Sequence, residues 1–307
     1  MTGKKVSKLR KSTTMVNEPE PSGWGGPWTE KKLKAFAKYV WAYLTILKTQ
    51  PQWKTIYFDG FAGSGTRTDE KTELYKQLSI TESDENMYQG AAERVLTLDD
   101  NLLFDFYYFI DTDQNALKKL EQKLSALPNA QKTSLQYRSG DCNQWLNELG
   151  TALRGNKYAA LILLDPFGMQ INWESIAQLK GTRSDIWILV PTGVIVNRLL
   201  FRNGNLKYIK KLECFFGLSE DEIKQEFYRT ATTVDLFGQE DEVVTKVVKP
   251  INQIMHVYIR QLKTIWNYVT EQPLRLDDRK GRPLFHLVFA SNNKNAVRIA
   301  KDIITVK

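Results

Sequence analysis

The fold is decided by the segment Tyr57-Phe58-Asp59-Gly60-Phe61-Ala62-Gly63-Ser64-Gly65-Thr66, which has the pattern of a short strand running into a glycine-rich turn. Glycines let a backbone pass close to a bound ligand, because a Cβ atom would fill the space that the ligand needs. Gly-x-Gly alone is a weak signal, since a strand can also end in a plain tight turn. The acid at the strand end strengthens the signal, because a carboxylate there can bind an amino group. The predicted ligand-binding residues of this segment are Asp59, Gly60, Phe61, Ala62, Gly63 and Gly65.

Two further strand ends carry acids that suit a nucleotide-type ligand. Asp111 closes the next predicted strand, where a carboxylate can accept both hydroxyls of a ribose. Asp113 is expected instead to cap the following helix. After the third strand, Asp141 either accepts from the amine of an adenine, with Cys142 beside it, or caps the next helix, and the sequence favours neither role.

A fourth acid ends the most apolar strand, in Leu163-Leu164-Asp165-Pro166-Phe167-Gly168. The continuous apolar run before it is typical of a central buried strand. Asp165 and a nearby carbonyl, aimed by the fixed φ of Pro166, could accept the hydrogens of a planar amine, on whose ring Phe167 could stack. A plain turn at the strand end would also explain the motif. Because four acidic strand ends occur in order, we predict a site here, with Asp165, Pro166 and Phe167 as its catalytic residues.

Strands and helices alternate from residue 54 onward, which is typical of a mostly parallel sheet with helices on both faces. The predicted strands are 54–60, 105–111, 134–139, 159–165 and 185–190, and the helices between them are 114–127, 143–154 and 173–180. The carboxyl ends of the strands form the ligand crevice of such an open sheet, so the four acids should gather at one edge. The sequence therefore predicts a doubly wound α/β fold.

The remaining segments define the expected domains. Residues 1–23 are basic and polar with almost no apolar content, and we expect a disordered tail. The α/β core comprises residues 24–196 and 270–307. Residues 197–269 interrupt the alternation, and we predict a helical insertion that lies over the crevice. Its helix-like segments include 220–228 and 246–268.

Three local patterns complete the core. An amphipathic helix is predicted over 29–48, with Thr29 as its N-cap. Near the other end of the chain, 273–276 and 283–289 are expected to pair as antiparallel strands, and a final helix covers 293–305.

Composition narrows the protein class. The 307 residues are 42% hydrophobic and 25% charged, and no apolar run approaches the roughly 18 residues of a membrane span, so we expect a soluble protein. Much of the net charge of +8 lies in the first 12 residues, where a solvated arm is a simpler explanation than a nucleic-acid arm. Two cysteines and two histidines lack metal-ligand spacing, so we expect no structural metal, no disulfides and a cytoplasmic location.

The chain resembles the three-Cys-motif partner proteins, a bacterial family similar to class I methyltransferases. The resemblance covers roughly residues 23–300 and rests on Gly26-Pro27-Trp28-Thr29-Glu30, on Tyr57 to Gly65 and on Asp165 to Gly168. It implies a Rossmann-like, seven-stranded, mostly parallel sheet and S-adenosylmethionine as the cofactor. It also implies a partner protein that carries the cysteine motifs, which are not the two cysteines of this chain.

Narrower resemblances bear on the substrate. The glycine loop is similar to that of amino-methyltransferases acting on DNA and RNA bases, which usually pair it with an Asp/Asn-Pro-Pro-aromatic motif. The single proline of Asp165-Pro166-Phe167-Gly168 departs from that motif and is closer to that of tRNA guanine-N2 methyltransferases, which leaves the acceptor atom open. The resemblance implies direct transfer of a methyl group to an amine of an RNA or DNA base.

A basic stretch in the insertion supports a nucleic-acid partner. Five basic residues and no acid occur within 14 positions, and they are Arg198, Arg202, Lys207, Lys210 and Lys211. Arg198 and Arg202 are four residues apart, as are Lys207 and Lys211, which would place each pair on one helical face. There Arg198, Arg202 and Lys207 could hold phosphates. A solvated helix face explains them about equally well.

Other functions stay open. A nicotinamide dehydrogenase uses a similar sheet, but its loop requires Gly-x-Gly-x-x-Gly or Ala, and here Gly63 and Gly65 are followed by Thr68. The pattern is also compatible with a partner subunit or binding module without catalysis of its own, and with a methyltransferase that acts on a protein or a small molecule.

Overall fold

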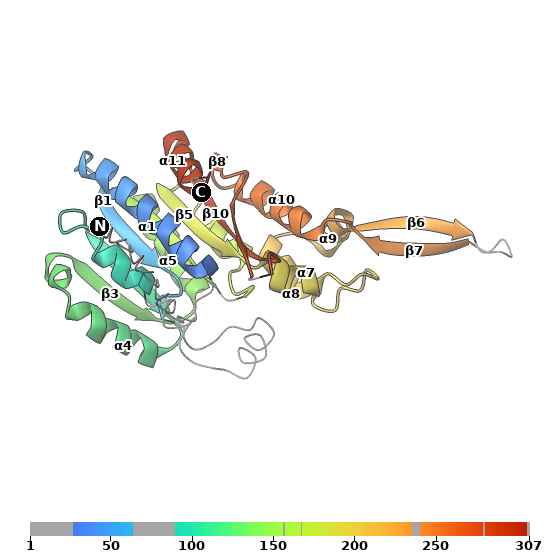
Figure 1. Cartoon of the computed structure of the whole chain (residues 1–307), viewed down its shortest axis with the longest axis horizontal. Helices are drawn as coiled ribbons and strands as arrows, with labels where there is room; N and C mark the ends of the chain where they lie inside the picture. The colour runs from blue at the N-terminus through green and yellow to red at the C-terminus, as the bar shows by residue number, and fades with distance from the viewer. Residues whose placement is uncertain are drawn as a thin grey trace, which may run out of the picture.

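The computed structural model describes residues 27–63, 90–155, 157–166, 168–234, 240–278 and 280–305. Their centre is an eight-stranded sheet covered by helices on both faces (Figure 1). The predictions for the N-terminal tail lie outside the described residues. Within them, no helix has both the length and the apolar character that a membrane span requires.

The sheet has the strand order β3-β2-β1-β4-β5-β10-β8. Strand β9 pairs with the first half of β10, from Pro283 to Leu287. Its parallel part consists of β1 (Lys54–Asp59), β2 (Phe106–Asp111), β3 (Ser134–Ser139), β4 (Tyr158–Leu164) and β5 (Ser184–Val190). The antiparallel part consists of β8 (Tyr268–Val269), β9 (Leu274–Asp277) and β10 (Pro283–Ser291). This arrangement confirms the predicted doubly wound, mostly parallel sheet, with seven strands on the main path.

Alternation of side chains along the strands divides the core into two layers. In β1, Ile56 and Phe58 pack into one hydrophobic cluster, whereas Tyr57 packs into the other. The helices that supply the first cluster are α5 (Cys142–Gly155), α6 (Trp173–Ala177), α8 (Ile209–Phe216), α9 (Glu220–Phe227) and α10 (Pro250–Leu262). The second cluster is supplied by α1 (Pro27–Lys48), α4 (Gln114–Ser125) and α11 (Lys294–Thr305). Burial on both faces therefore explains the apolar strand β4.

The first helix departs from prediction at its start. Helix α1 begins at Pro27, a residue whose fixed φ suits the first helical position, so Thr29 lies inside the helix and the predicted N-cap at Thr29 is wrong. Trp41, in the same helix, is 51% exposed. Lys32, to which the pattern gave no role, lies on the buried face.

The insertion is not wholly helical, which corrects the prediction for 197–269. After the π-helical turn η2 (Thr192–Val196) and the short α7 (Asn197–Leu199), helices α8 and α9 lead into an antiparallel hairpin of β6 (Tyr228–Val234) and β7 (Glu240–Lys246). The hairpin extends away from the body of the protein as an arm (Figure 1). The predicted helix over 246–268 starts only at Pro250, because the β-branched residues before it favour the extended strand.

The base of the arm is fixed by a half-buried lysine. The Lys246 Nζ atom donates to the backbone oxygen and the Oδ1 of Asn197 at 2.6 and 2.7 Å, and to the backbone oxygen of Leu200 at 2.7 Å. Desolvation lowers the Lys246 pKa to about 8, with the positive charge of Arg202 contributing. These bonds tie the second strand of the arm to the segment that leaves the sheet after β5.

The C-terminal elements agree with prediction. Strands β9 and β10 form the expected antiparallel pair, and α11 follows shortly after β10. The short helix η1 (Pro128–Lys132) joins α4 to β3.

Candidate functional site

Three buried carboxylates lie at adjacent strand ends on one edge of the sheet. Asp59 ends β1, Asp111 ends β2, and Asp165 follows the last residue of β4. Since β1 pairs in parallel with both β2 and β4, the three strand ends meet at the same edge. The exposed fractions are 2% for Asp59, 5% for Asp111 and 2% for Asp165. We call these three residues the acidic rim.

Asp59 is held by its own strand and by the turn that follows. Its Oδ2 accepts from the Tyr57 hydroxyl at 3.0 Å, and its Oδ1 accepts from the Phe61 backbone N–H at 3.2 Å. Burial nevertheless raises the Asp59 pKa to about 7, and the negative charges of Asp165 and Asp111 add to that effect. The acidic rim therefore brings three carboxyl groups together where they are shielded from solvent.

Asp111 connects the second strand to the glycine turn. Its Oδ2 accepts from the Gly63 backbone N–H at 3.2 Å, and its Oδ1 accepts from the Asp113 backbone N–H at 2.8 Å. Asp113 itself caps α4 by accepting from the Asn115 N–H at 2.8 Å, which confirms the predicted cap. The turn after β1 is thus fastened to the end of β2.

The glycine turn packs against protein where a ligand contact was expected. A Cβ atom on Gly60 would lie 2.5 Å from Cys142 Sγ and 2.8 Å from Leu164 Cδ2, so a side chain is excluded by the core beneath the turn. Cys142 is 4% exposed and belongs to that core. Two predictions are therefore wrong, because both positions face the interior. Gly60 is required by the core and not by a ligand, and the Cys142 side chain does not face a ligand.

Asp141 is the exposed member of the series. It directly precedes α5, and its Oδ1 accepts from the Asn143 backbone N–H at 2.9 Å and from Asn143 Nδ2 at 3.0 Å. Of the two roles that the sequence left open, the structure shows the helix cap. The carboxylate also stays at the sheet edge, next to the end of β3, because β3 runs parallel to β2.

Asp165 forms a buried ion pair with a residue that sequence reasoning missed. The Lys32 Nζ atom lies 2.5 Å from Asp165 Oδ2, and the two side chains are 2% and 3% exposed. The same Nζ atom lies 5.5 Å from the centre of the Trp28 ring. A lysine on the buried stripe of an amphipathic helix, four residues before Phe36, was the signal that could have identified it.

The other predicted site residues lie close to these acids in sequence. Pro166 is buried beside Asp165, and Ala62 is buried in the turn, with Phe61 next to it half-buried. Gly65 and Phe167 lie outside the described residues. No group of three His, Cys, Asp or Glu side chains within the described residues is arranged to hold a metal ion.

The basic residues of the insertion do not share a helical face, which corrects that prediction. Arg198 lies in the three-residue helix α7, whereas Arg202 and Lys207 lie in non-helical chain before α8. All three are exposed. They follow β5 and so leave the sheet from the same edge as the acidic rim. Lys210, in α8, forms an ion pair with Glu213 at 2.8 Å.

Comparisons with known proteins give little beyond this topology. No protein-family model and no curated protein matches the chain. Among solved structures, it is similar to the methyltransferase domain of bacterial CtHen1-C, at 12% identity and a TM-score of 0.35, over 84% of this chain and 100% of that one. It is also similar to protein LPL1258 from Legionella pneumophila str. Philadelphia 1, at 12% identity and a TM-score of 0.33, over 85% of this chain and 97% of that one. Likeness at this level assigns no activity, and the resemblance to the three-Cys-motif partner proteins stays a prediction.

Proposed function

We propose that the protein is an S-adenosylmethionine-dependent methyltransferase. The observation that carries the proposal is the acidic rim, in which Asp59, Asp111 and Asp165 are buried at neighbouring strand ends. Buried carboxylates favour positive charge and hydrogen-bond donors, and the protein itself supplies some of these through Lys32 and the backbone N–H groups of Phe61 and Gly63. S-adenosylmethionine offers a sulfonium, an ammonium, two ribose hydroxyls and an adenine amine, so its donors complement this edge.

The residues available for the cofactor follow from their positions. Each Asp59 oxygen accepts one hydrogen bond among the described residues, which leaves acceptor capacity for an amino group. Asp111 would accept from the ribose hydroxyls, and Asp141 from the adenine amine. The backbone from Phe61 to Gly63 would lie along the cofactor. When bound, the cofactor supplies a methyl group activated by its positive sulfur.

The acceptor proposed for this methyl group is an amine of an RNA or DNA base. Asp165 and the carbonyl of Pro166 would accept the hydrogens of the amine, and Phe167 would stack on the base. Because Lys32 binds Asp165 Oδ2, we assign Lys32 the task of fixing the orientation of that carboxylate. The protein then contributes chiefly alignment of the amine for in-line attack.

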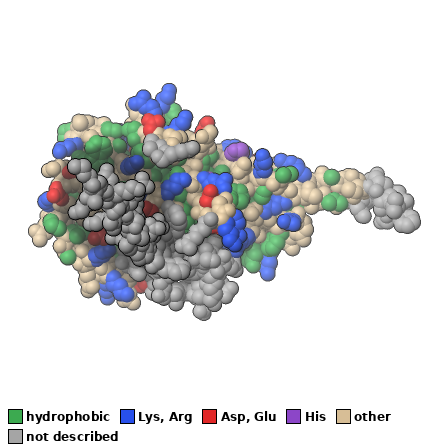
Figure 2. All heavy atoms as spheres, viewed as in Figure 1, with side chains coloured by type: hydrophobic (Ala, Val, Ile, Leu, Met, Phe, Trp, Pro, Cys, Tyr) green, Lys and Arg blue, Asp and Glu red, His purple; other side chains and the backbone are tan. Residues whose placement is uncertain are grey.

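A basic surface beside the rim supports a nucleic-acid substrate. Arg198, Arg202 and Lys207 are exposed on the segment that leaves β5 at the rim edge, and Figure 2 shows Lys and Arg side chains grouped where the arm meets the body. Phosphates of a strand entering the site would meet these charges. A partner protein with cysteine motifs remains a further prediction of the family resemblance.

The cofactor is tested by calorimetry with S-adenosylmethionine and with NAD. We expect S-adenosylmethionine to bind and NAD not to bind. The substitutions Asp59→Asn and Asp111→Asn should each weaken the binding of S-adenosylmethionine at least ten-fold. Asp302→Asn, which alters an exposed acid on α11, is the matched control and should bind normally. Absence of S-adenosylmethionine binding, or equal effects of the three variants, contradicts the proposal.

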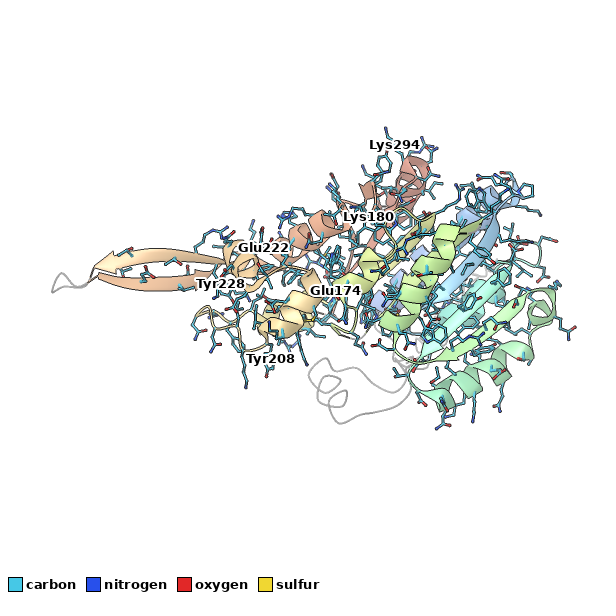
Figure 3. All side chains as sticks on the ribbon, turned by 180° about the vertical axis from the view of Figure 1, so that it is seen from behind. Glu174, Lys180, Tyr208, Glu222, Tyr228 and Lys294 are labelled. Atoms are coloured by element: carbon cyan, nitrogen blue, oxygen red, sulfur yellow. The ribbon has the colours of Figure 1, made fainter. Side chains whose placement is uncertain are left out.

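The substrate is tested by transfer of radiolabelled methyl groups to RNA, DNA and protein fractions. We expect label in a nucleic-acid fraction, and its loss in Asp165→Asn with cofactor binding retained. The double variant Arg202→Glu/Lys207→Glu should raise KM for that substrate more than it lowers kcat. Lys180→Glu is the control, because Lys180 lies far from Tyr208 and the base of the arm (Figure 3). Label confined to protein would refute the nucleic-acid assignment while leaving the cofactor assignment intact.

A further inference from the structure

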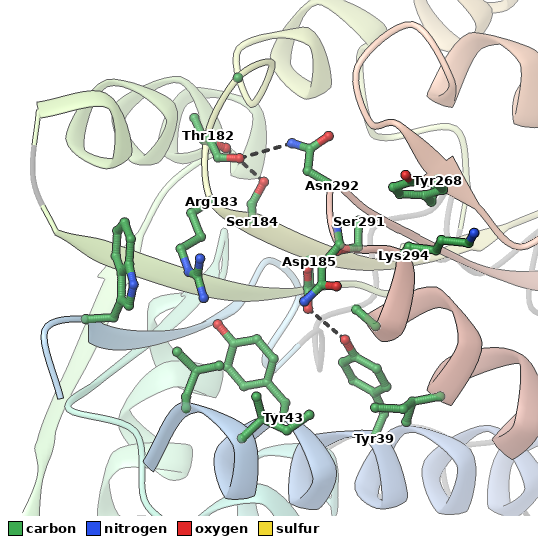
Figure 4. Close-up of a pocket in the computed structure, with 17 residues that line it drawn as sticks. Tyr39, Tyr43, Thr182, Arg183, Ser184, Asp185, Tyr268, Ser291, Asn292 and Lys294 are labelled. Carbon is green, nitrogen blue, oxygen red and sulfur yellow. Dashed lines mark hydrogen bonds between the residues drawn. The ribbon is translucent and has the colours of Figure 1, made fainter. Parts of the chain in front are cut away.

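A polar cavity lies at the edge of the sheet opposite the acidic rim. It has a volume of about 540 Å³ and is bounded by α1, the start of β5, the end of β10 and the start of α11 (Figure 4). Its walls combine charged and aromatic side chains. They include Tyr39, Tyr43, Trp53, Arg183, Asp185 and Lys294. Cavities of about 300 to 1,000 Å³ are the usual size for small-molecule sites.

The centre of this cavity is a carboxylate held in a fixed orientation. Asp185 accepts from the Tyr39 hydroxyl at 2.7 Å through Oδ2 and from the Ser291 hydroxyl at 2.5 Å through Oδ1. Each oxygen has one of these bonds, so each retains a lone pair for a further donor. Because Tyr39 comes from α1 and Ser291 from the end of β10, two separate elements orient one acceptor toward the cavity (Figure 4).

Two basic side chains, Arg183 and Lys294, also line this cavity. Figure 4 shows Asp185 between Arg183 and Lys294. The Arg183 guanidinium lies 4.4 Å from the centre of the Trp53 ring and donates to Gln50 Oε1 at 2.8 Å, so it is held at the cavity wall. Lys294 is the first residue of α11, where the helix N-terminus adds to the attraction for an anion. The cavity therefore combines one fixed acceptor with two basic side chains on its lining.

An unpaired hydroxyl marks the cavity as a site for polar atoms. Tyr43 is 6% exposed, and its hydroxyl has no hydrogen-bond partner within the described part of the chain. Figure 4 shows this hydroxyl directed from α1 toward Arg183 and Asp185. A buried donor without a partner is unusual in folded proteins, and a polar group in the adjoining cavity would satisfy it.

We propose that this cavity binds a guanine nucleotide. Guanine presents two adjacent N–H donors on its Watson–Crick edge, which match the two oxygens of the Asp185 carboxylate. Its phosphate would lie against Lys294 and Arg183, and a polar atom of the nucleotide would pair with the Tyr43 hydroxyl. An anion alone would be repelled by Asp185, and a cation alone by the two basic groups, so both chemical features are required.

The proposed nucleotide site is independent of the acidic rim. Asp185 belongs to the amino end of β5, whereas Asp59 and Asp165 lie at the carboxyl ends of β1 and β4, which run parallel to β5. The two sites are therefore separated by the length of the strands. Binding here does not depend on the proposed methyl transfer and is measured without it.

The test is calorimetry on the full chain with GMP, guanosine, AMP and inorganic phosphate as separate probes. We expect GMP to bind at least ten-fold more tightly than each of the others, since guanosine lacks the phosphate, AMP lacks the adjacent donors, and inorganic phosphate lacks the base. Lys294→Glu should weaken GMP at least ten-fold and leave guanosine unchanged. Lys301→Glu, an exposed position on the same helix outside this cavity, should change neither.

Asp185→Asn should weaken both GMP and guanosine at least ten-fold. Asp185 also accepts hydrogen bonds from Tyr39 and Ser291, so a thermal melt checks that Asp185→Asn folds. If Asp185→Asn does not fold, the result for Lys294→Glu tests the proposal. The proposal is overturned by absence of GMP binding, by inorganic phosphate or AMP binding as tightly as GMP, or by equal effects of Lys294→Glu and Lys301→Glu.

Discussion

Replacement of Lys32 by methionine tests the buried ion pair at the acidic rim. The substitution keeps the approximate length of the side chain but removes the charge that lies 2.5 Å from Asp165. Coulomb's law gives an attraction of about 7 kcal/mol at that distance with an effective dielectric constant of about 20, and the cost of desolvating both ions offsets part of it. Removing one partner of such a pair costs about 3 to 5 kcal/mol, because the other charge stays buried and uncompensated.

The assay is urea unfolding at pH 7 without added ligand, followed by tryptophan fluorescence. We expect the free energy of unfolding to fall by about 3 to 5 kcal/mol for Lys32→Met and by a similar amount for Asp165→Asn. The double variant should lose at least about 2 kcal/mol less than the sum of the two singles, since it leaves neither charge of the pair buried alone. Lys34→Met is the control, because Lys34 is 69% exposed and pairs with Glu30 at 3.6 Å, and it should change stability by less than about 1 kcal/mol.

Additive effects of Lys32→Met and Asp165→Asn would refute the ion pair. A coupling energy below about 0.5 kcal/mol between Lys32 and Asp165 means that the two side chains do not interact in solution. Lys32 would then not orient the Asp165 carboxylate. The position of Asp165 at the end of β4 would not be affected.

Three further predictions concern the rim, the turn and helix α9. Burial raises the Asp59 pKa above its unfolded value to about 7, so the folded chain binds an extra proton between about pH 4 and 7, and this group's contribution to stability falls as pH rises through that range. Binding of S-adenosylmethionine should strengthen from pH 6 to 8 as Asp59 becomes charged, and calorimetry on Asp59→Asn should lose that part of the pH dependence. Gly60→Ala should cost about 1 to 3 kcal/mol in urea unfolding because of its clash with Cys142, and Cys142→Ala should restore part of the loss, whereas Gly155→Ala, with open space at its Cβ, should be neutral or stabilising. Ser219→Ala removes the capping box of α9 and should cost about 1 kcal/mol in the same assay, and an unchanged midpoint would contradict the observed cap.

The sheet was predictable because its signals are local. Each parallel strand is a short β-rich run that ends in or just before a polar residue or a proline, and strand direction alone then places Asp59, Asp111 and Asp165 at one edge. The hairpin arm was not predicted, because its strands are exposed and lack the apolar alternation of a core strand. The two-residue strand β8 has no sequence pattern of its own and exists because β10 offers it a partner.

Of the candidate site, the sequence predicted only the acidic residues at the strand ends. Lys32 lies 133 residues from Asp165 in sequence, and a lysine on a surface helix is normally solvated, so only the packing of α1 on the sheet brings the two together. The carboxylate of Asp185 was missed for the same reason, since its partners Tyr39 and Ser291 come from distant elements. Roles that depend on one residue and its neighbours in sequence, such as the Asp113 cap, were within reach of the pattern.

Helix α1 joins the two edges of the sheet. Lys32, Tyr39 and Tyr43 are separated by seven and four residues, so they share one helical face and span about 16 Å along the axis at about 1.5 Å per residue. Between them Phe36 packs on Tyr57 and Trp187, with ring centres 6.1 and 6.4 Å apart, so the middle of the helix is fixed to the sheet. A shift of α1 along its axis would therefore alter the Lys32 contact at the rim and the Tyr39 bond to Asp185 together. The same rigid helix sets the geometry of both sites, which is why its buried face carries polar groups at two places where apolar side chains would pack at lower cost.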